Sequence, residues 1–279
     1  PAQRGAVFSL RNQIFFAVSS LCSILFGLWL DWIVYPLNYQ IMYGITFVIS
    51  MFSLFYLSKV EVNKDHQQKP PTKKEKIKLK QRFTKMVNDF KDNPQFSRYN
   101  INMFIMDFGL WSIAPLFTVF YVNELGAQES WLGLNAAISS VANTVGFGLW
   151  RRIINRKGRK TVLLFTALLR PIFPFVVALI PNLTAIIITN VVLGLLMPGL
   201  SMSLYSLMMD AMPNSRREEF TAYYTMFTNA SMFIGPLVGA VVVGLIGYRT
   251  TFLIFGGVRL LGGLMWRILP VKELKPDMS

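Results

Sequence analysis

A few charged side chains lie inside long apolar segments, and these are the first candidates for chemistry. Asp107 lies about seven residues inside the apolar segment 101–122, roughly 10 Å deep at about 1.5 Å per helical residue. A carboxylate at that depth is costly unless it faces protein or water. Asp107 is therefore a candidate proton-coupling site or a counter-ion for a cationic substrate. The alternative is a structural ion pair with Arg170 or Arg259, which lie near the middle of two other segments.

Uncharged polar side chains form a second set of candidates. Asn135, Ser139 and Asn143 recur every four residues, which places them on one face of a helix. Two interpretations stay open for such residues: they line a central cavity, or they pack helices together, as small polar residues commonly do in membranes. The other members of the set, on further apolar segments, are Trp111, Asn190, Ser201, Tyr224 and Thr228.

The sequence offers little material for metal or nucleophilic chemistry. It contains one cysteine, Cys22, inside an apolar segment, and one histidine, His66, in a hydrophilic stretch. These residues form neither a His/Cys metal site nor a Ser/His/Asp or Cys/His catalytic group. No nucleotide-binding loop of the Gly-x-x-x-x-Gly-Lys-Ser/Thr kind is present. We expect no metal, no cofactor and no enzymatic activity, with a carboxylate-based membrane enzyme left open.

Long apolar segments must position these residues. A helix needs roughly 20 mostly apolar residues to cross a bilayer, and continuous runs of that length do not fit the alternating strands of a membrane barrel. The sequence therefore predicts an all-α, polytopic transmembrane bundle with about eight spans. The predicted spans are 14–32, 39–57, 101–122, 131–150, 162–180, 183–209, 220–246 and 251–269. Prolines at 115, 171, 174, 198 and 236 predict kinks in four of them.

The net charge of +14 follows membrane topology. On an alternating path, nearly all basic residues outside the spans fall on one side, and the opposite loops hold only Arg249. This is the positive-inside pattern, so both termini are predicted to be cytoplasmic. We expect a multi-pass protein of the plasma (inner) membrane that contacts the lipid bilayer, binds no nucleic acid and is monomeric. Asp210, at a cytoplasmic span end, is expected to pair with Arg216 or Arg217.

The spans group as two and then six. Residues 1–58 hold two spans, residues 59–98 form a basic cytoplasmic linker, and residues 99–279 hold a complete set of six. Within the linker, 67–72 reads as flexible, and 73–90 predicts an amphipathic helix that either lies on an anionic membrane surface or is a solvated linker helix.

A weak internal repeat supports a plan of two six-span halves. At an offset of 212 residues, Pro1, Arg4, Phe8, Phe15, Ser19 and Gly27 align with Pro213, Arg216, Phe220, Phe227, Ser231 and Gly239. Parallel duplicated halves are a known transporter plan. Because the chain begins with Pro1 in what reads as a loop, we expect it to be a fragment that lacks four N-terminal spans.

Two motifs add to this plan. The stretch 150–160 reads Trp-Arg-Arg-Ile-Ile-Asn-Arg-Lys-Gly-Arg-Lys, and 235–239 reads Gly-Pro-Leu-Val-Gly. With the 6+6 plan and the basic central loop, the whole chain resembles the major facilitator superfamily, from its fifth to its twelfth span. The first stretch is similar to that family's cytoplasmic loop G-x-x-x-D-R-x-G-R-R/K, and the second to its Gly-Pro-x-x-Gly element.

The resemblance assigns residues to both motifs. In the loop, Arg156, Gly158, Arg159 and Lys160 match, whereas Asn155 stands where the family has Asp and Arg151 where it has the first Gly. The missing Asp removes one partner of a charged latch at this loop. Gly235, Pro236 and Gly239 would form a helix kink. The corresponding Gly-Pro pair, an antiporter feature of the family, is absent from the first visible span.

The resemblance implies a secondary active transporter that moves a small organic solute by alternating access, with protons as a candidate coupling ion through Asp107. Two other classes remain as alternatives. One is a non-transporting membrane sensor or scaffold on the same fold. The other is a membrane-embedded enzyme or lipid scramblase.

Overall fold

The computed structural model describes residues 2–59 and 79–271, and every regular element in those ranges is a helix. The helices in chain order are α1 Ala2–Trp32, α2 Leu37–Ser58, α3 Leu79–Asp92, α4 Pro94–Trp111, α5 Ala114–Asn123, α6 Glu129–Lys157, α7 Arg159–Leu169, α8 Ile172–Leu179, α9 Leu183–Ala211, α10 Arg217–Ile246 and α11 Tyr248–Ile268. A short 3₁₀ turn, η2 Asn214–Arg216, precedes α10. The described ranges hold eight segments long and apolar enough to cross a membrane, as the sequence predicts.

Two of the predicted spans are broken in the middle. The span 101–122 is divided into α4 and α5 at Ser112 and Ile113, just before Pro115, and the span 162–180 into α7 and α8 at Arg170 and Pro171. Proline lacks the amide hydrogen that would continue the helical ladder, so each break lies next to one. The prolines at 198 and 236 behave differently, because α9 and α10 continue through them as single helices.

The basic stretch 150–160 is mostly helical, which corrects the predicted loop. α6 continues to Lys157, and α7 begins at Arg159. Gly158 alone separates them, with φ +81°. That value lies in the region that glycine adopts at little cost, so one residue is sufficient to reverse the chain.

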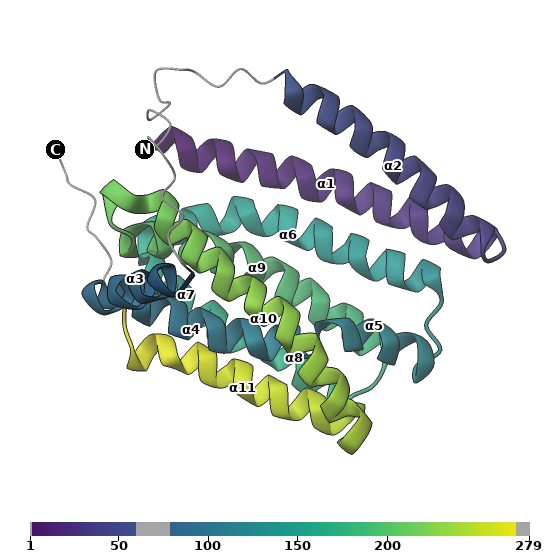
Figure 1. Ribbon diagram of the computed structural model, residues 1–279. Coiled ribbons are helices and arrows are strands. Elements are labelled where there is room, and N and C mark those ends of the chain that lie inside the picture. The colour runs from purple at the N-terminus through teal and green to yellow at the C-terminus, as the bar shows by residue number, and fades with distance from the viewer. Residues whose placement is uncertain (1, 60–78, 272–279) are drawn as a thin grey trace.

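The helices form one bundle with a pair of helices along one edge (Figure 1). α1 packs along α6, α6 packs along α9, and α4 is covered by α10 and α11. α2 lies beyond α1, at the opposite side of the bundle from α11 (Figure 1). α1 begins and α11 ends at the end of the bundle where α3 lies (Figure 1).

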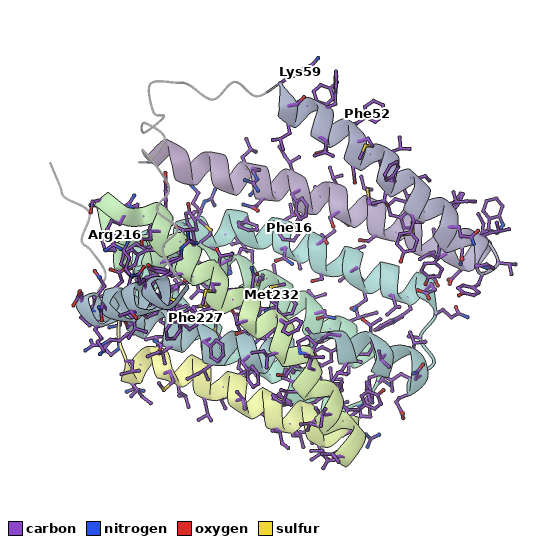
Figure 2. The ribbon with its side chains drawn as sticks, viewed as in Figure 1. Phe16, Phe52, Lys59, Arg216, Phe227 and Met232 are labelled. Carbon is purple, nitrogen blue, oxygen red and sulfur yellow. The ribbon has the colours of Figure 1, made fainter. Side chains whose placement is uncertain are left out.

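α2 is almost bare of protein contacts. Asn38 is its one buried residue, and the Asn38 amide donates to the Leu30 carbonyl at 2.9 Å. Phe52 points away from the bundle (Figure 2) and is 62% exposed. An apolar helix with this exposure is suited to contact with lipid, where its side chains need no protein partner.

α3 is held against α10 by a cluster of charged side chains near Arg216 (Figure 2). Two nitrogens of Arg216 donate to the two Asp89 oxygens at 2.7 and 2.6 Å, and Arg216 also pairs with Glu219 at 2.7 Å. The Tyr223 hydroxyl lies 3.0 Å from Asp89 as well. Beside the cluster, Phe90 packs on the Phe227 ring with centroids 5.3 Å apart. The predicted segment 73–90 therefore appears as a docked helix in its part from Leu79 onward, and its residues 73–78 lie outside the described ranges.

Asp89 makes this docking pH-dependent. The hydrogen bond from Arg216 holds the pKa of the Asp89 carboxyl below its usual range. A carboxylate with a lowered folded-state pKa stabilises the fold above its unfolded pKa, about 3.9, and that contribution is lost as the pH falls through the folded value. We predict that Asp89→Asn lowers the melting temperature at pH 7 and that the difference from wild type shrinks below about pH 4.

The measurement is thermal unfolding of the detergent-solubilised protein at pH 7 and pH 3, with Asp92→Asn as the matched control. Asp92 lies on the same helix and is exposed. A difference for Asp89→Asn that stays constant between the two pH values would contradict the prediction.

Candidate functional site

A cavity of about 330 Å³ lies near the middle of the bundle. Its wall draws on α1, the broken pair α4 and α5, α6, α8, α9 and α11, together with the break between α7 and α8. Phe16, from α1, closes it at the boundary with α6 (Figure 2), where its ring stacks on Phe147 at 5.8 Å. The polar side chains on the wall are Ser139, Asn143, Arg170, Asn190 and Arg259.

Two arginines give the cavity its electrostatic character. Arg259 is 4% exposed, and its Nε finds no hydrogen-bond partner among the described residues. The buried Nε of Arg170 is likewise without a partner there, while its Nη1 contacts the Met197 sulfur, a weak acceptor. Both guanidinium groups therefore retain unused donor capacity beside an open space.

The broken helix and a glycine place these arginines. Arg170 is the last residue before Pro171, where α7 gives way to α8, so it sits at mid-span. Arg259 lies on α11 where that helix crosses α4 at Gly109. A Cβ at Gly109 would stand 2.7 Å from the Arg259 backbone nitrogen, so the close crossing needs glycine.

Asp107 is not among the residues that line the cavity. It is half-buried on α4, one turn before Leu110, which does line it. Asp107 interacts electrostatically with Arg259 and, more weakly, with Arg170. Among the described residues it forms no direct ion pair with either arginine. The sequence treats both arginines as possible partners of Asp107, whereas the structure makes them cavity residues in their own right.

The predicted stripe on α6 reaches the cavity in two of its three positions. Ser139 and Asn143 line the wall, and Asn190 faces them from α9. Asn135 lies at the edge, where its Oδ1 accepts a 2.8 Å bond from the Asn190 amide. Asn143 donates to the Ser139 carbonyl at 2.8 Å, and its own Oδ1 finds no partner in the described part of the chain.

The remaining polar candidates lie away from this cavity. Trp111 packs against α10, the Ser201 hydroxyl donates to the Pro198 carbonyl at 3.1 Å, and Tyr224 is hydrogen-bonded to Thr228 one turn along α10. The sequence shows that these residues are polar and intramembrane. It does not show which helix faces point inward, because that depends on how α10 turns relative to α4.

The Gly-Pro-x-x-Gly element lets α10 approach the break in the α4–α5 span. A Cβ at Gly235 would lie 3.0 Å from the Trp111 carbonyl carbon, and a Cβ at Gly239 would collide with the Ser112 carbonyl oxygen. Pro236 stands between them inside a continuous helix. The two glycines thus act as a flat surface for helix contact.

The basic motif of residues 150–160, which lacks its own Asp, is paired with a carboxylate from another helix. Arg159 donates to Asp210 at 2.9 Å, across the ends of α7 and α9, with both side chains mostly buried. Arg216, one of the two partners predicted for Asp210, is engaged instead by Asp89 and Glu219. Three other motif residues are exposed: Asn155, Arg156 and Lys160. Asp210 therefore replaces the missing motif Asp as a partner of Arg159 alone.

α1 and α6 meet closely away from this end. The ideal Cβ of Gly27 would lie 3.0 Å from the Gly133 Cα, so the two backbones touch. Asp31 accepts a 2.9 Å bond from the Ser130 amide, in the first turn of α6, where a carboxylate opposes the positive end of the helix dipole. The Tyr39 hydroxyl donates to Glu129 at 2.9 Å. The sequence gives Asp31 no role, because its target lies 99 residues further along the chain.

The glycine surface on α10 yields a stability prediction. Gly239→Ala places a methyl group against the Ser112 carbonyl, so we expect a loss of about 1–3 kcal/mol, as in other overpacked contacts. Gly244→Ala, on the same helix with nothing within 4 Å, is the matched control and should be neutral. Equal melting temperatures for the two variants in detergent would contradict this close contact.

The Arg159–Asp210 pair yields a second prediction. A double-mutant cycle with Arg159→Gln and Asp210→Asn should give a coupling free energy of about 0.5–3 kcal/mol. The same cycle with Arg156→Gln and Asp210→Asn should give none, because Arg156 is exposed. Chemical unfolding in detergent measures both, and additive effects in the first cycle would refute the pairing.

Comparison with known proteins agrees with this architecture. The family model described as Major Facilitator Superfamily matches residues 99–277. Multidrug resistance protein MdtG of Proteus mirabilis (strain HI4320) is 28% identical over 178 residues, which cover 59% of this chain and 44% of that protein. The protein of the same name from Serratia proteamaculans (strain 568) is 27% identical over 191 residues, covering 64% of this chain and 46% of that protein.

The chain spans less than half the length of these curated relatives. The family match nevertheless covers all six spans from α4 to α11, the part of the chain that contains both motifs and most of the cavity wall. The chain is a multi-pass membrane protein that belongs to the Major Facilitator Superfamily.

Proposed function

We propose that the protein is a secondary active transporter that moves small organic solutes across the membrane by alternating access. The observation that supports this most is the cavity within the bundle, whose wall is made by helices from several spans and carries five polar side chains among apolar ones. A volume of about 330 Å³ lies within the range of small-ligand sites, about 300–1,000 Å³. Lipid does not hydrate arginine or asparagine, so a cavity with these residues serves a polar occupant.

The contact between α1 and α6 supports a moving interface. Residues 1–58 and 99–279 are proposed to belong to two different halves, and α1 is the helix that joins the first to the second. α1 packs along α6 over an extensive contact, which includes two facing glycines, an aspartate at a helix start and one aromatic stack. All of these contacts are non-covalent, so they can separate and re-form. Rocking of one half against the other opens a central site to each side in turn.

Further parts of the proposal concern the setting. The basic residues support a plasma-membrane protein whose termini and α3 lie on the cytoplasmic side. The relatives are named multidrug resistance proteins, which supports solute export as the direction. We propose a monomer that binds lipid and solute, with no nucleic acid partner and no enzymatic activity.

Asp107 is proposed as the proton-coupling residue. It is a carboxylate within a span, near two arginines but in direct contact with neither. Gain or loss of its proton changes the charge balance around the two cavity arginines, which is the kind of change that can link proton movement to solute binding. The polar residues Ser139, Asn143 and Asn190 are proposed to contact the solute, and Asn135 to orient Asn190.

The test is transport by inverted vesicles that contain the full-length protein, screened with a panel of labelled solutes. We expect uptake driven by a proton gradient in wild type, and uptake at the level of the gradient-free control in Asp107→Asn. Asp92→Asn, an exposed carboxylate on α3, should transport as wild type.

Unchanged gradient dependence in a folded Asp107→Asn protein would remove Asp107 from coupling. Absence of flux for every solute in wild type would instead favour a sensor or scaffold on the same fold.

A further inference from the structure

The two cavity arginines are a pair without a matching pair of carboxylates. Arg170 and Arg259 approach the same space from two different spans. Every other described residue on that wall is uncharged. Among the described residues, Asp107 is the one carboxylate that interacts electrostatically with these arginines, so the group carries two positive charges against one negative charge.

Burying these charges costs free energy unless a further group supplies opposite charge and hydrogen bonds. Removing an ion from water costs several kcal/mol even after relaxation, and the cost is recovered only by close opposite charge and hydrogen bonds. Asp107 supplies opposite charge but no direct bond, and the Nε atoms of both arginines have no partner in the described structure. Both arginines line the cavity.

The chemistry of the donors indicates what fits there. A guanidinium presents donors in a planar fork that matches the oxygens of a carboxylate or a phosphate group. The unpartnered Asn143 Oδ1 offers an acceptor on the same wall, which suits a hydroxyl or amine elsewhere on the ligand. Phe16, Phe117 and Phe173 form an aromatic part of the wall, and the Phe117 and Phe173 rings meet at 4.9 Å. An aromatic wall suits an apolar body attached to the charged group.

We propose that this cavity binds small organic anions, and that Arg170 and Arg259 together hold a carboxylate or phosphate group of the ligand. The proposal names the substrate class of the transport site and so rests on the proposed function for its purpose, but binding is measured without transport. It replaces one of the interpretations that the sequence left open, in which Asp107 is the counter-ion of a cationic substrate. Asp107 in this arrangement positions the arginines and does not touch the ligand.

The experiment is equilibrium binding to the detergent-purified protein by isothermal titration. The probes are benzoate and phenyl phosphate, which carry the two anionic groups on one apolar body, and benzylamine, the cationic analogue of the same size. We expect at least one anion to bind and benzylamine not to bind. Arg170→Gln and Arg259→Gln should each weaken anion binding by about 10- to 100-fold, the value of a charge-assisted hydrogen bond in a binding constant.

Matched variants separate a specific site from a general effect of charge. Arg249→Gln removes an exposed arginine from the same helix, α11, and should bind the anion as wild type does. Arg259→Lys keeps the charge but loses the fork and should bind the anion with intermediate affinity, which also gives a folded test protein if Arg259→Gln does not fold.

The source of the anionic group is tested in two bicelle compositions. If the ligand is a soluble organic anion, the probe that binds in detergent binds equally in phosphatidylcholine bicelles and in bicelles that contain phosphatidylglycerol. If the probe binds in phosphatidylcholine bicelles but not in bicelles that contain phosphatidylglycerol, the cavity binds a lipid headgroup. That result would overturn the proposal that the ligand is a soluble organic anion.

Tighter binding of benzylamine than of either anion, or wild-type anion binding by both arginine variants, would also overturn the proposal. Anion binding without flux in vesicles would leave the site intact and refute transport. Flux of a cation without anion binding would support transport and refute the anion site.

Discussion

The rest of the structure depends on keeping two guanidinium groups at the middle of a helical bundle. A charged group at that depth needs nearby charge, hydrogen bonds or water, and the bundle supplies these only in part. Asp107 interacts electrostatically with both arginines, and both arginines line a cavity. The local irregularities of the bundle serve this placement. Pro171 ends α7 at Arg170, and Gly109 admits α11 at Arg259.

Much of the fold follows from the sequence alone, since membrane spans are specified by long apolar runs. All eight predicted spans are present, and two of the four with predicted kinks break at the residues before a proline. The extent of α6 was not predicted, because basic residues such as Arg151 and Arg152 read as loop although they continue the helix beyond the apolar run. At Pro198 the span is not divided, because α9 continues through this proline as one helix.

The site was less accessible to sequence reasoning than the fold. The period of four that links Asn135, Ser139 and Asn143 identifies one helix face, and two of these residues lie on the cavity wall. The sequence shows the arginines as charges near the middle of two spans. That they line the same cavity depends on how α7, α8 and α11 pack. Asp210 shows the same limitation, because proximity in sequence favoured Arg216 whereas the packed ends of α7 and α9 bring Arg159 to it. Pairings across a bundle are a property of packing, which a single sequence does not state.

Phe16 gives the cavity a wall that belongs to a different part of the chain from the arginines. Its ring is held on Phe147 by stacking and not by a covalent or charged link. Any displacement of α1 along α6 therefore changes the size of the space that an occupant feels. By thermodynamic reciprocity, an occupant that prefers one size must in turn bias where α1 rests, with equal free energy. Occupancy of the cavity and the position of α1 are thus coupled in one equilibrium, through the Phe16 side chain.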